Sequence, residues 1–328
     1  MLQDRVWNRA QETRAGGQAL GLLAAPLNVE ILRALEHETR NLLELRQAVG
    51  SPPQSTMRVY TRALAELGVL ERRRRKEFPA TAEYSLTPAG QSLLAVVNVL
   101  ETWLQAAPHG PLTIGSVAAK SATKALAGGW SANLVRALAA RPLTLTELNI
   151  LIPRISYPSL ERRLGAMRLA NLIEAQPSNG RGVPYQAAPW LHRAVLPLTT
   201  AIAWEQRHLR ETDAKIGGVD AEAAFLLAIP LISLGSQVTG KCRLSVEVRG
   251  AVEPGFAGVV VGVEQGEVVS CTARLKGSAE ASACGTPGAW IRELAGATEP
   301  QLEMSGDFTL ARALIEALQA LSSARVRS

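Results

Sequence analysis

The spacing of apolar positions predicts a regular order of helices and strands in the first third of the chain. Apolar side chains at helical spacing predict helices at residues 20–35, 41–49, 54–67 and 88–105. Between the third and the fourth helix, residues 69–76 and 82–86 are predicted as two strands. Gly68 should end the third helix in the left-handed conformation that glycine adopts without strain. The predicted order is therefore three helices, a β-hairpin and a long last helix.

The same order of elements is predicted a second time further along the chain. At an offset of 103 positions the recurring segments are residues 31–35, 42–45 and 67–71; beyond the hairpin the offset is 101, and Tyr84, Pro88 and Trp103 pair with Tyr185, Pro189 and Trp204. The offset between matching residues stays constant except for one change inside a loop, and this regularity indicates two copies of one domain. We expect these copies at residues 15–107 and 118–211.

The elements of the second copy follow those of the first. Asn171 takes the place of Gly68 and can adopt the same left-handed conformation. Strands are predicted at residues 172–176 and 183–187, joined by a glycine-containing turn, and a long helix at residues 189–210. The hairpin is shorter than in the first copy, which explains the change of offset.

Residues 218–328 have no partner in the repeat and form a third predicted domain. An apolar helix at residues 221–234 precedes strands at 241–249, 256–263, 267–272 and 278–285. A short helix at 287–294, a strand at 301–305 and an amphipathic helix at 309–321 complete it. This pattern predicts an α+β domain with a mostly antiparallel sheet.

Charge is distributed unevenly between these parts. Of the 35 basic and 29 acidic residues, those at 1–215 sum to +9 and those at 216–328 to −3. A basic front part suggests an anionic partner for it. No apolar run is long enough for a membrane span, no signal peptide is recognisable, and the three cysteines and four histidines are scattered. These observations predict a cytoplasmic protein without a disulfide framework, metal site or other cofactor.

Three helices followed by a hairpin are the elements of a winged helix-turn-helix, whose third helix enters the major groove. Two motifs carry a closer resemblance, Glu83-Tyr84-Ser85-Leu86-Thr87-Pro88-Ala89-Gly90 and Ile155-Ser156-Tyr157 with Leu160-Glu161-Arg162-Arg163-Leu164. With Trp130 in an early helix, both copies resemble the HxlR family of bacterial winged-helix regulators. Many members of that family carry a cysteine ahead of the first helix. Neither copy has one, so thiol sensing at that position is not expected.

The resemblance implies homodimers that bind palindromic DNA. A chain with two copies would supply both winged helices itself, as a monomeric pseudo-dimer, unless two chains associate as a homodimer. Because the third helices differ, with Arg58 aligned to Glu161 and Gln54 to Tyr157, we expect an imperfect palindrome with unequal half-sites.

The DNA-contacting residues are expected on the third helices and the wings, where polar and basic side chains can reach bases and phosphates. In the first copy the candidates are Gln54, Ser55, Thr56, Arg58, Arg62, Arg72, Arg73, Arg74, Arg75 and Lys76. In the second copy they are Ser156, Tyr157, Ser159, Arg162, Arg163 and Arg181. A basic run is commonly no more than a solvated strand, but its place on a wing favours phosphate contact.

The third domain resembles the sterol-carrier-protein fold. The resemblance rests on Gly285-Thr286-Pro287-Gly288-Ala289-Trp290 and on Met304-Ser305-Gly306-Asp307 before the last helix. It implies a hydrophobic cavity for a small-molecule effector between sheet and helices. Candidate lining residues, for each of which the alternative is ordinary core, are Phe225, Leu227, Ile229, Phe256, Val260 and Trp290.

The full expectation is a multidomain chain: two mainly α winged helices with β-hairpin wings, followed by an α+β sterol-carrier-like domain. The predicted function is a transcriptional regulator that binds double-stranded DNA and responds to a hydrophobic effector. In the alternative, the third domain only mediates protein–protein contacts. An architectural DNA-binding protein without sequence preference also stays open. An enzyme is not expected, because residues 218–328 contain no histidine and no arrangement of nucleophile and base.

Overall fold

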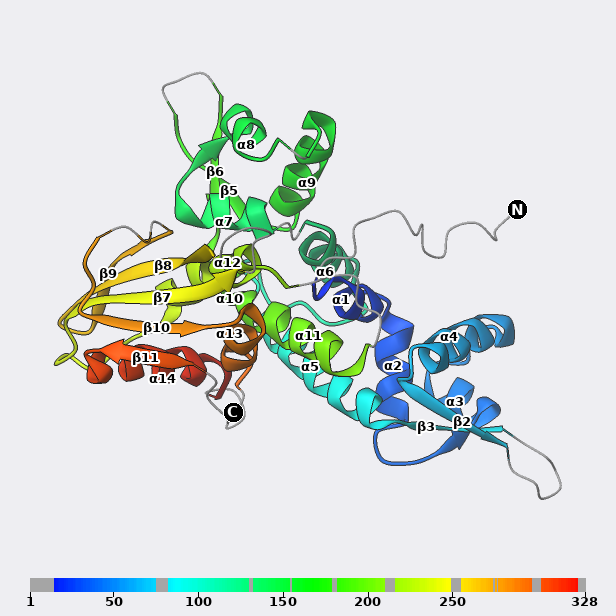
Figure 1. The fold of residues 1–328 in the computed structure, drawn as a ribbon. Helices are drawn as coiled ribbons and strands as arrows, with labels where there is room; N and C mark the ends of the chain where they lie inside the picture. The colour runs from blue at the N-terminus through cyan, green and yellow to red at the C-terminus, as the bar shows by residue number, and fades with distance from the viewer. Residues whose placement is uncertain are drawn as a thin grey trace.

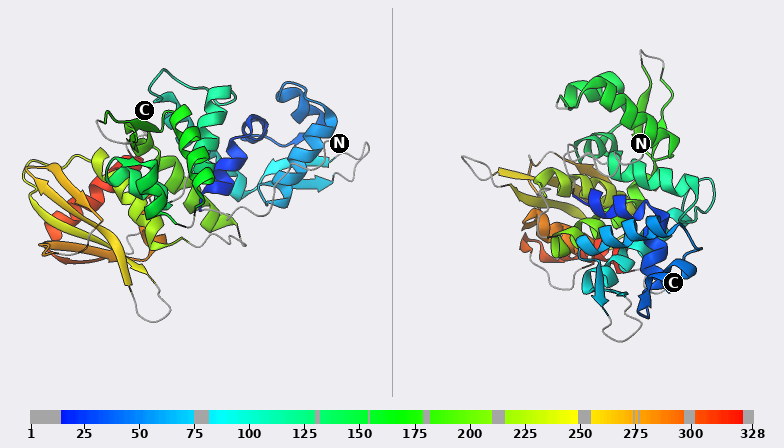
Figure 2. Two further views of the ribbon diagram at one scale, coloured as in Figure 1. Left: turned by 90° about the horizontal axis from the view of Figure 1, so that it is seen from above. Right: turned by 90° about the vertical axis from the view of Figure 1, so that its right-hand side faces the viewer.

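A computed structural model gives the fold of the chain (Figure 1). It describes residues 15–74, 82–129, 132–153, 155–178, 182–209, 216–248, 255–273, 275, 277–296 and 302–323. The sheet of the C-terminal part lies at one end of the molecule and the first β-hairpin at the other, with a layer of helices between them (Figure 2).

The first part of the chain contains the predicted helices around a small sheet. Its elements are α1 (Gly17–Leu23), α2 (Pro26–Ala34), β1 (Arg40–Asn41), α3 (Leu42–Ala48), α4 (Gln54–Glu66), β2 (Leu70–Arg74), β3 (Ala82–Leu86) and α5 (Pro88–Gln105). The sheet has the order β1-β3-β2. The helix predicted at residues 20–35 is two helices, because Pro26 begins a new one at its first position, where the missing N–H is not needed.

The next part repeats this order of elements. It comprises α6 (Val117–Gly129), α7 (Ala132–Ala140), β4 (Leu143–Thr144), α8 (Leu145–Leu151), α9 (Tyr157–Leu169), β5 (Ile173–Ala175), β6 (Pro184–Ala187), α10 (Pro189–Arg193) and α11 (Val195–His208). The helix predicted at residues 189–210 is interrupted at Ala194. This break places Pro197 in the first turn of α11, where its lack of an N–H costs no hydrogen bond.

The local hydrogen bonding of the two parts follows the same register. Asn41 and Thr144 begin α3 and α8, and each forms a capping box with the glutamate three residues later. Tyr84 pairs with Arg40 in the first sheet, and Tyr185 pairs with Leu143 in the second. The predicted left-handed residues are confirmed by a φ of 73° at Gly68 and 57° at Asn171. At these positions the two parts therefore share one local pattern of capping, strand pairing and helix termination.

The C-terminal part packs three helices against one face of a five-stranded sheet. Its elements are α12 (Gly218–Ala228), the 3₁₀ turn η1 (Ile229–Leu231), β7 (Gly240–Val248), β8 (Gly255–Glu264), β9 (Glu267–Thr272), β10 (Ala281–Gly285), α13 (Pro287–Leu294), β11 (Glu303–Gly306) and α14 (Phe308–Ser323). The strand order is β11-β10-β7-β8-β9, with β10 parallel to β7 and the other neighbours antiparallel. Alternate residues such as Leu244, Val261 and Ala283 are buried under the helices.

A reciprocal pair of hydrogen bonds joins the long helix α5 to α10 and α11 and so holds the first two parts together. Trp103 Nε1 on α5 donates to the Trp190 carbonyl at 3.0 Å, and Trp204 Nε1 on α11 donates to the Ala89 carbonyl at 2.9 Å. Each bond is the image of the other under the offset of 101 residues. Such an exchange, in which each half contributes the same contact, characterises an interface with two-fold symmetry. Trp190 also stacks on Trp103, with ring centroids 4.3 Å apart.

The C-terminal part is attached to the second of these parts. Helix α12 packs against α7 and α10, and α13 packs against α11. Arg136 Nε on α7 lies 3.2 Å from Oε1 of the buried Glu222 on α12. His192 Nδ1 lies 3.2 Å from the Leu227 carbonyl, and burial lowers the pKa of this histidine. These contacts place the C-terminal part beside α7, α10 and α11.

A buried carboxylate anchors the first helix to α11. The oxygens of Glu205 accept hydrogen bonds from the backbone N–H of Gly16 at 2.6 Å and of Ala19 at 2.7 Å. Burial raises the pKa of Glu205 to about 7, although these bonds oppose the rise. The residue at the related position of α5 is Leu104, so this anchor exists in one half only.

The tryptophan pair allows a matched test of the interface. Trp103→Phe and Trp204→Phe each remove one hydrogen bond between the two parts, and each should lower the free energy of unfolding by about 0.5–1.5 kcal/mol, since the half-buried Ala89 carbonyl also accepts from Ser92 Oγ. Trp103→Phe should cost more, because it also weakens the stacking on Trp190. Urea denaturation measures both values. Equal stability of Trp204→Phe and wild type would show that the second bond contributes nothing.

The buried Glu205 should make stability depend on pH. Its pKa of about 7 lies above the ordinary value of 4.5, so the folded chain retains a proton that the unfolded chain releases between these values. The free energy of unfolding that this carboxyl contributes therefore falls as pH rises through that window. In Glu205→Gln this fall should disappear. Urea denaturation of both proteins between pH 4.5 and 7 gives the difference in their free energies of unfolding. The effects of the other buried acids are common to both proteins and cancel in this difference. A difference that does not change with pH would contradict the role assigned to Glu205.

Candidate nucleic-acid interface

Helix α4 presents one apolar and one polar side. Met57, Thr61 and Leu64 are buried against the neighbouring helices, and the Thr61 hydroxyl donates to the Met57 carbonyl at 2.8 Å. The predicted contact residues lie away from this core: Gln54, Ser55, Arg58 and Arg62 are exposed, and Thr56 is half-buried. Arg62 Nε donates to Glu66 one turn later at 2.8 Å. Arg58 is exposed and forms no such ion pair among the described residues.

Helix α9 has the same division with different outward residues. Leu160, Leu164 and Met167 are buried in it. Of the predicted contact residues, Ser156, Tyr157 and Arg162 are exposed, and Ser159 and Arg163 are half-buried. Its surface also exposes Leu169 at the position related to Glu66. The two helices therefore expose different groups at positions related by the offset of 103 residues.

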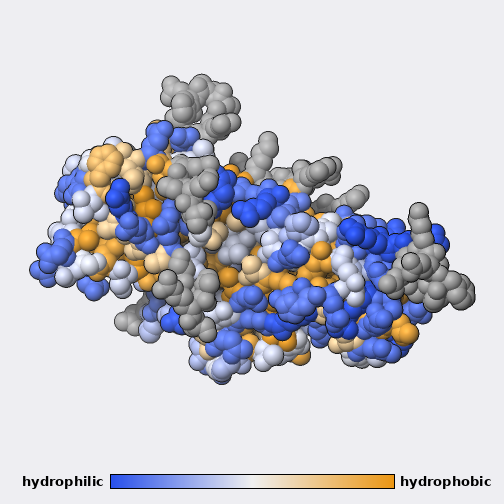
Figure 3. All heavy atoms as spheres, turned by 90° about the horizontal axis from the view of Figure 1, so that it is seen from below, coloured by the Kyte–Doolittle hydropathy of each residue, from blue (hydrophilic) through white to orange (hydrophobic). Residues whose placement is uncertain are grey.

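The first hairpin carries a dense positive charge. In β2 only Leu70 is buried, and Arg72, Arg73 and Arg74 are exposed. Glu71 accepts from Arg73 Nε at 2.8 Å, and this hydrogen bond raises the pKa of the guanidinium. Hydrophilic residues gather at this end of the molecule (right in Figure 3). Arg75, Lys76 and Arg181, also predicted as DNA contacts, lie outside the described residues.

The second hairpin lacks this charge on the related strand. The positions that correspond to Arg72, Arg73 and Arg74 are Ala175, Gln176 and Pro177. The exposed cations of this half include Lys120 and Lys124 on α6, besides Arg141, Arg162, Arg168, Arg193 and Arg207. These lysines belong to none of the sequence motifs. The sequence does mark the segment around them in another way, because residues 102–146 contain no aspartate or glutamate.

The six residues predicted to line an apolar cavity are divided between two places. Phe225, Leu227, Ile229 and Trp290 are fully buried on the helical side of the sheet. Phe225 and Trp290 are in edge-to-face contact at 4.7 Å, and Trp290 Nε1 donates to the Ser245 carbonyl at 2.8 Å. Phe256 is 60% exposed and Val260 is half-buried, beside strand neighbours that point inward. The structure therefore buries four of the six and leaves the other two exposed or half-buried.

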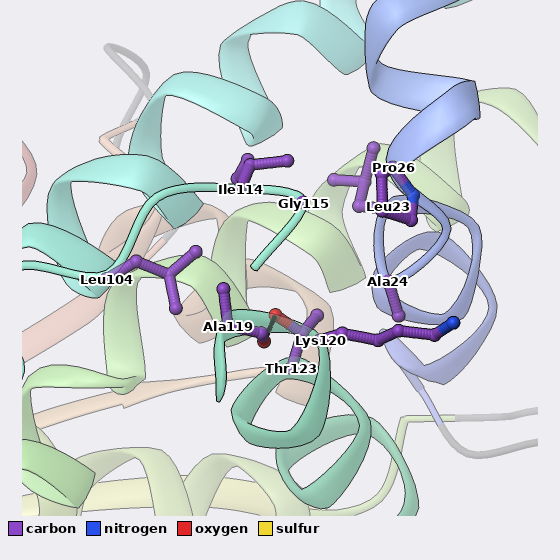
Figure 4. Close-up of a pocket in the computed structure, with 9 residues that line it drawn as sticks. All are labelled: Leu23, Ala24, Pro26, Leu104, Ile114, Gly115, Ala119, Lys120 and Thr123. Atoms are coloured by element: carbon purple, nitrogen blue, oxygen red, sulfur yellow. Dashed lines mark hydrogen bonds between the residues drawn. The ribbon is translucent and has the colours of Figure 1, made fainter. Parts of the chain in front are cut away.

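Two hollows of the described surface lie elsewhere. One, of about 10 Å³, has room for about one water molecule between the first two parts (Figure 4). It is lined by Leu23, Ala24, Pro26, Leu104, Ile114, Gly115, Ala119, Lys120 and Thr123. The other is an open groove of about 310 Å³ along α14, lined by Phe308, Thr309, Arg312, Ala313 and Glu316. Neither reaches the core around Phe225 and Trp290.

The described residues offer little for other chemistry. They contain no group of three histidine, cysteine or acidic side chains that could hold a metal ion. Burial raises the pKa of Cys242 and of Cys271 to about 12, so both thiols stay protonated and unreactive near neutral pH. Among the helices within the described ranges, none has the length and hydrophobicity to cross a membrane.

A comparison with known protein families identifies most of the first part of the chain, from α2 to α5. Residues 23–109 match the family described as HxlR-like helix-turn-helix. Among solved structures, the chain is similar to that of diamide-treated YodB from B. subtilis, with 24% identity and a TM-score of 0.26 over 27% of this chain and 87% of that one. No curated protein matches the chain.

Residues 23–109 thus form an HxlR-like winged helix-turn-helix domain, which indicates a DNA-binding transcriptional regulator. Domains of this family bind DNA and are commonly dimeric, and its regulators are typically not enzymes.

Proposed function

We propose that this protein is a transcriptional regulator that binds DNA as a single-chain pseudo-dimer. Residues 15–107 and 118–211 are its two winged helices, and residues 218–328 are a regulatory domain with a sterol-carrier-like fold. Its place of action is the bacterial cytoplasm, at the nucleoid. The reciprocal bonds of Trp103 and Trp204 carry this proposal, because they relate the two copies as two subunits of a dimer are related.

The second winged helix is supported by its hydrogen-bonding register. The strand pairs of β4, β6 and β5 lie at the positions that the offsets predict from β1, β3 and β2. The sterol-carrier-like assignment is supported by a five-stranded sheet with helices on one face and a last helix after Asp307.

The DNA site of this regulator is an imperfect palindrome. The first half-site is read by α4 and its wing, the second by α9. Arg58 and Glu161 occupy related positions, and a glutamate accepts from cytosine where an arginine donates to guanine. The two half-sites therefore differ in sequence.

Selection of duplexes from a random pool tests this function. We expect a consensus with two unequal half-sites whose centres lie about 10 base pairs, or a multiple of that, apart. Arg58→Ala should relax the preference in one half-site and Arg162→Ala in the other, each at a cost of about 1–3 kcal/mol. A bound pool without any consensus would instead identify an architectural protein.

Control by an apolar small molecule in the C-terminal domain is the regulatory part of the proposal. The ligand would lie between the sheet and its helices, where Phe225 and Trp290 now touch, so these rings must separate to admit it. Because α12 and α13 pack on the second copy, such a change would alter that copy's position. The closed packing equally favours the alternative, a domain that only contacts other proteins.

A thermal-shift screen with fatty acids, sterols and aromatic acids separates the two roles. A ligand present at a hundredfold excess over its Kd should stabilise the chain by about 2.7 kcal/mol. It should also change the affinity for the selected duplex. The variant Trp290→Phe keeps an apolar ring but changes the shape of this core. A ligand that binds there should therefore stabilise the variant and the wild type by different amounts. If none of the compounds in the screen stabilises the chain, the result would favour a domain that only contacts other proteins.

A further inference from the structure

Helix α6 occupies the space between the two DNA-reading helices. It packs against α9 of its own copy and against α1 of the first copy. Figure 1 shows α9, α6 and α1 in succession, with α2 and α4 following. A duplex that contacts α4 and α9 together must cross this region, because two half-sites are separated by about one helical turn or a multiple of it.

The outward side of α6 is basic. Its buried residues are Ala119, Ala122, Thr123, Ala125 and Leu126. Lys120 and Lys124 are exposed and stand one turn apart on the opposite side of the helix. Within the described part of the chain neither forms an ion pair. Figure 4 shows the Lys120 side chain extending from α6 toward Ala24, at the junction with the first copy.

The segment that contains these lysines, and the helix α1 packed on it, carry no acidic residue. Acids account for 29 of the 328 residues, yet none occurs at residues 102–146, which contain four lysines and arginines. Helix α1, which packs on α6, also has no charged residue. On α9 the exposed Glu161 is accompanied by the exposed Arg162 and Arg168. Ordinary surface lysines alternate with acids, whereas a surface that meets phosphate has reason to exclude them.

The lysines belong to one copy only. The positions related to them by the offset of 103 are Gly17 and Gly21 of α1. Conversely, the arginines of β2 have uncharged counterparts in the second copy, from Ala175 to Pro177. The first copy therefore concentrates cations on its wing, at the outer end of the interface. The second has two exposed lysines on α6, near the centre, in addition to the exposed arginines of α9.

We propose that Lys120 and Lys124 bind the DNA backbone between the two half-sites. The inference rests on the proposed function and adds a central phosphate contact to it. Such a contact carries no base information, but it sets how the duplex lies across the pseudo-dimer. Phosphate binding is thus divided unequally, with the wing serving the first half-site and α6 the centre and the second.

Binding to a random-sequence duplex of about 30 base pairs at several salt concentrations tests this contact. Lys120→Gln with Lys124→Gln should reduce the slope of log K against log salt by about 2 and weaken binding roughly tenfold at 0.1 M salt. The matched control is Lys241→Gln with Arg312→Gln, which removes the same charge from exposed positions of the C-terminal domain. Its slope should equal that of wild type.

A third double variant, Arg72→Gln with Arg74→Gln, separates the central contact from the proposed function. Reduced slopes in this variant and in the α6 variant, with none in the control, support the inference. A reduced slope in the wing variant alone overturns it and leaves the proposed function intact. Absence of salt-dependent binding by wild type overturns both. Hydroxyl-radical footprints on the selected duplex should, in addition, lose protection between the half-sites when the α6 lysines are replaced.

Discussion

The arrangement of the molecule depends on the contact between α5 and α11. Two buried indoles, Trp103 and Trp204, each donate to a carbonyl of the other half, and the stacked Trp190 fills the space between the helices. An unmade buried hydrogen bond costs more than a made one contributes, so the two bonds favour one relative position of the copies. This position determines where α4 and α9 lie with respect to each other.

Around this symmetric contact the chain has become asymmetric. Glu205 anchors α1 in one half, where the other half has Leu104. The C-terminal domain packs on α7, α10 and α11 of the second copy, with the Arg136–Glu222 ion pair at the junction. In a homodimer both halves must change together, since one gene encodes both. The two parts of this chain differ in their exposed cations, in the outward residues of α4 and α9 and in the attachment of the C-terminal part.

Much of this organisation could be predicted from periodicity and repetition. The boundaries of α5, β3, β9 and α13 follow directly from apolar spacing and turn residues, and the left-handed Gly68 and Asn171 follow from helix-termination chemistry. The breaks at Pro26 and Ala194 were missed, because an apolar pattern continues across them. The lysines of α6 were missed because isolated cations form no motif; only the absence of acids around them marked the segment.

The sequence by itself determined the order of the elements, the two offsets and the uneven charge, since each depends on residues that are close along the chain or repeated within it. Tertiary structure decided which surfaces meet. It placed Trp103 against the carbonyl of residue 190, buried Glu205 at a helix N-terminus, and separated Phe256 and Val260 from the core of Phe225 and Trp290. These contacts join residues up to 189 positions apart, and no local preference of the chain specifies them.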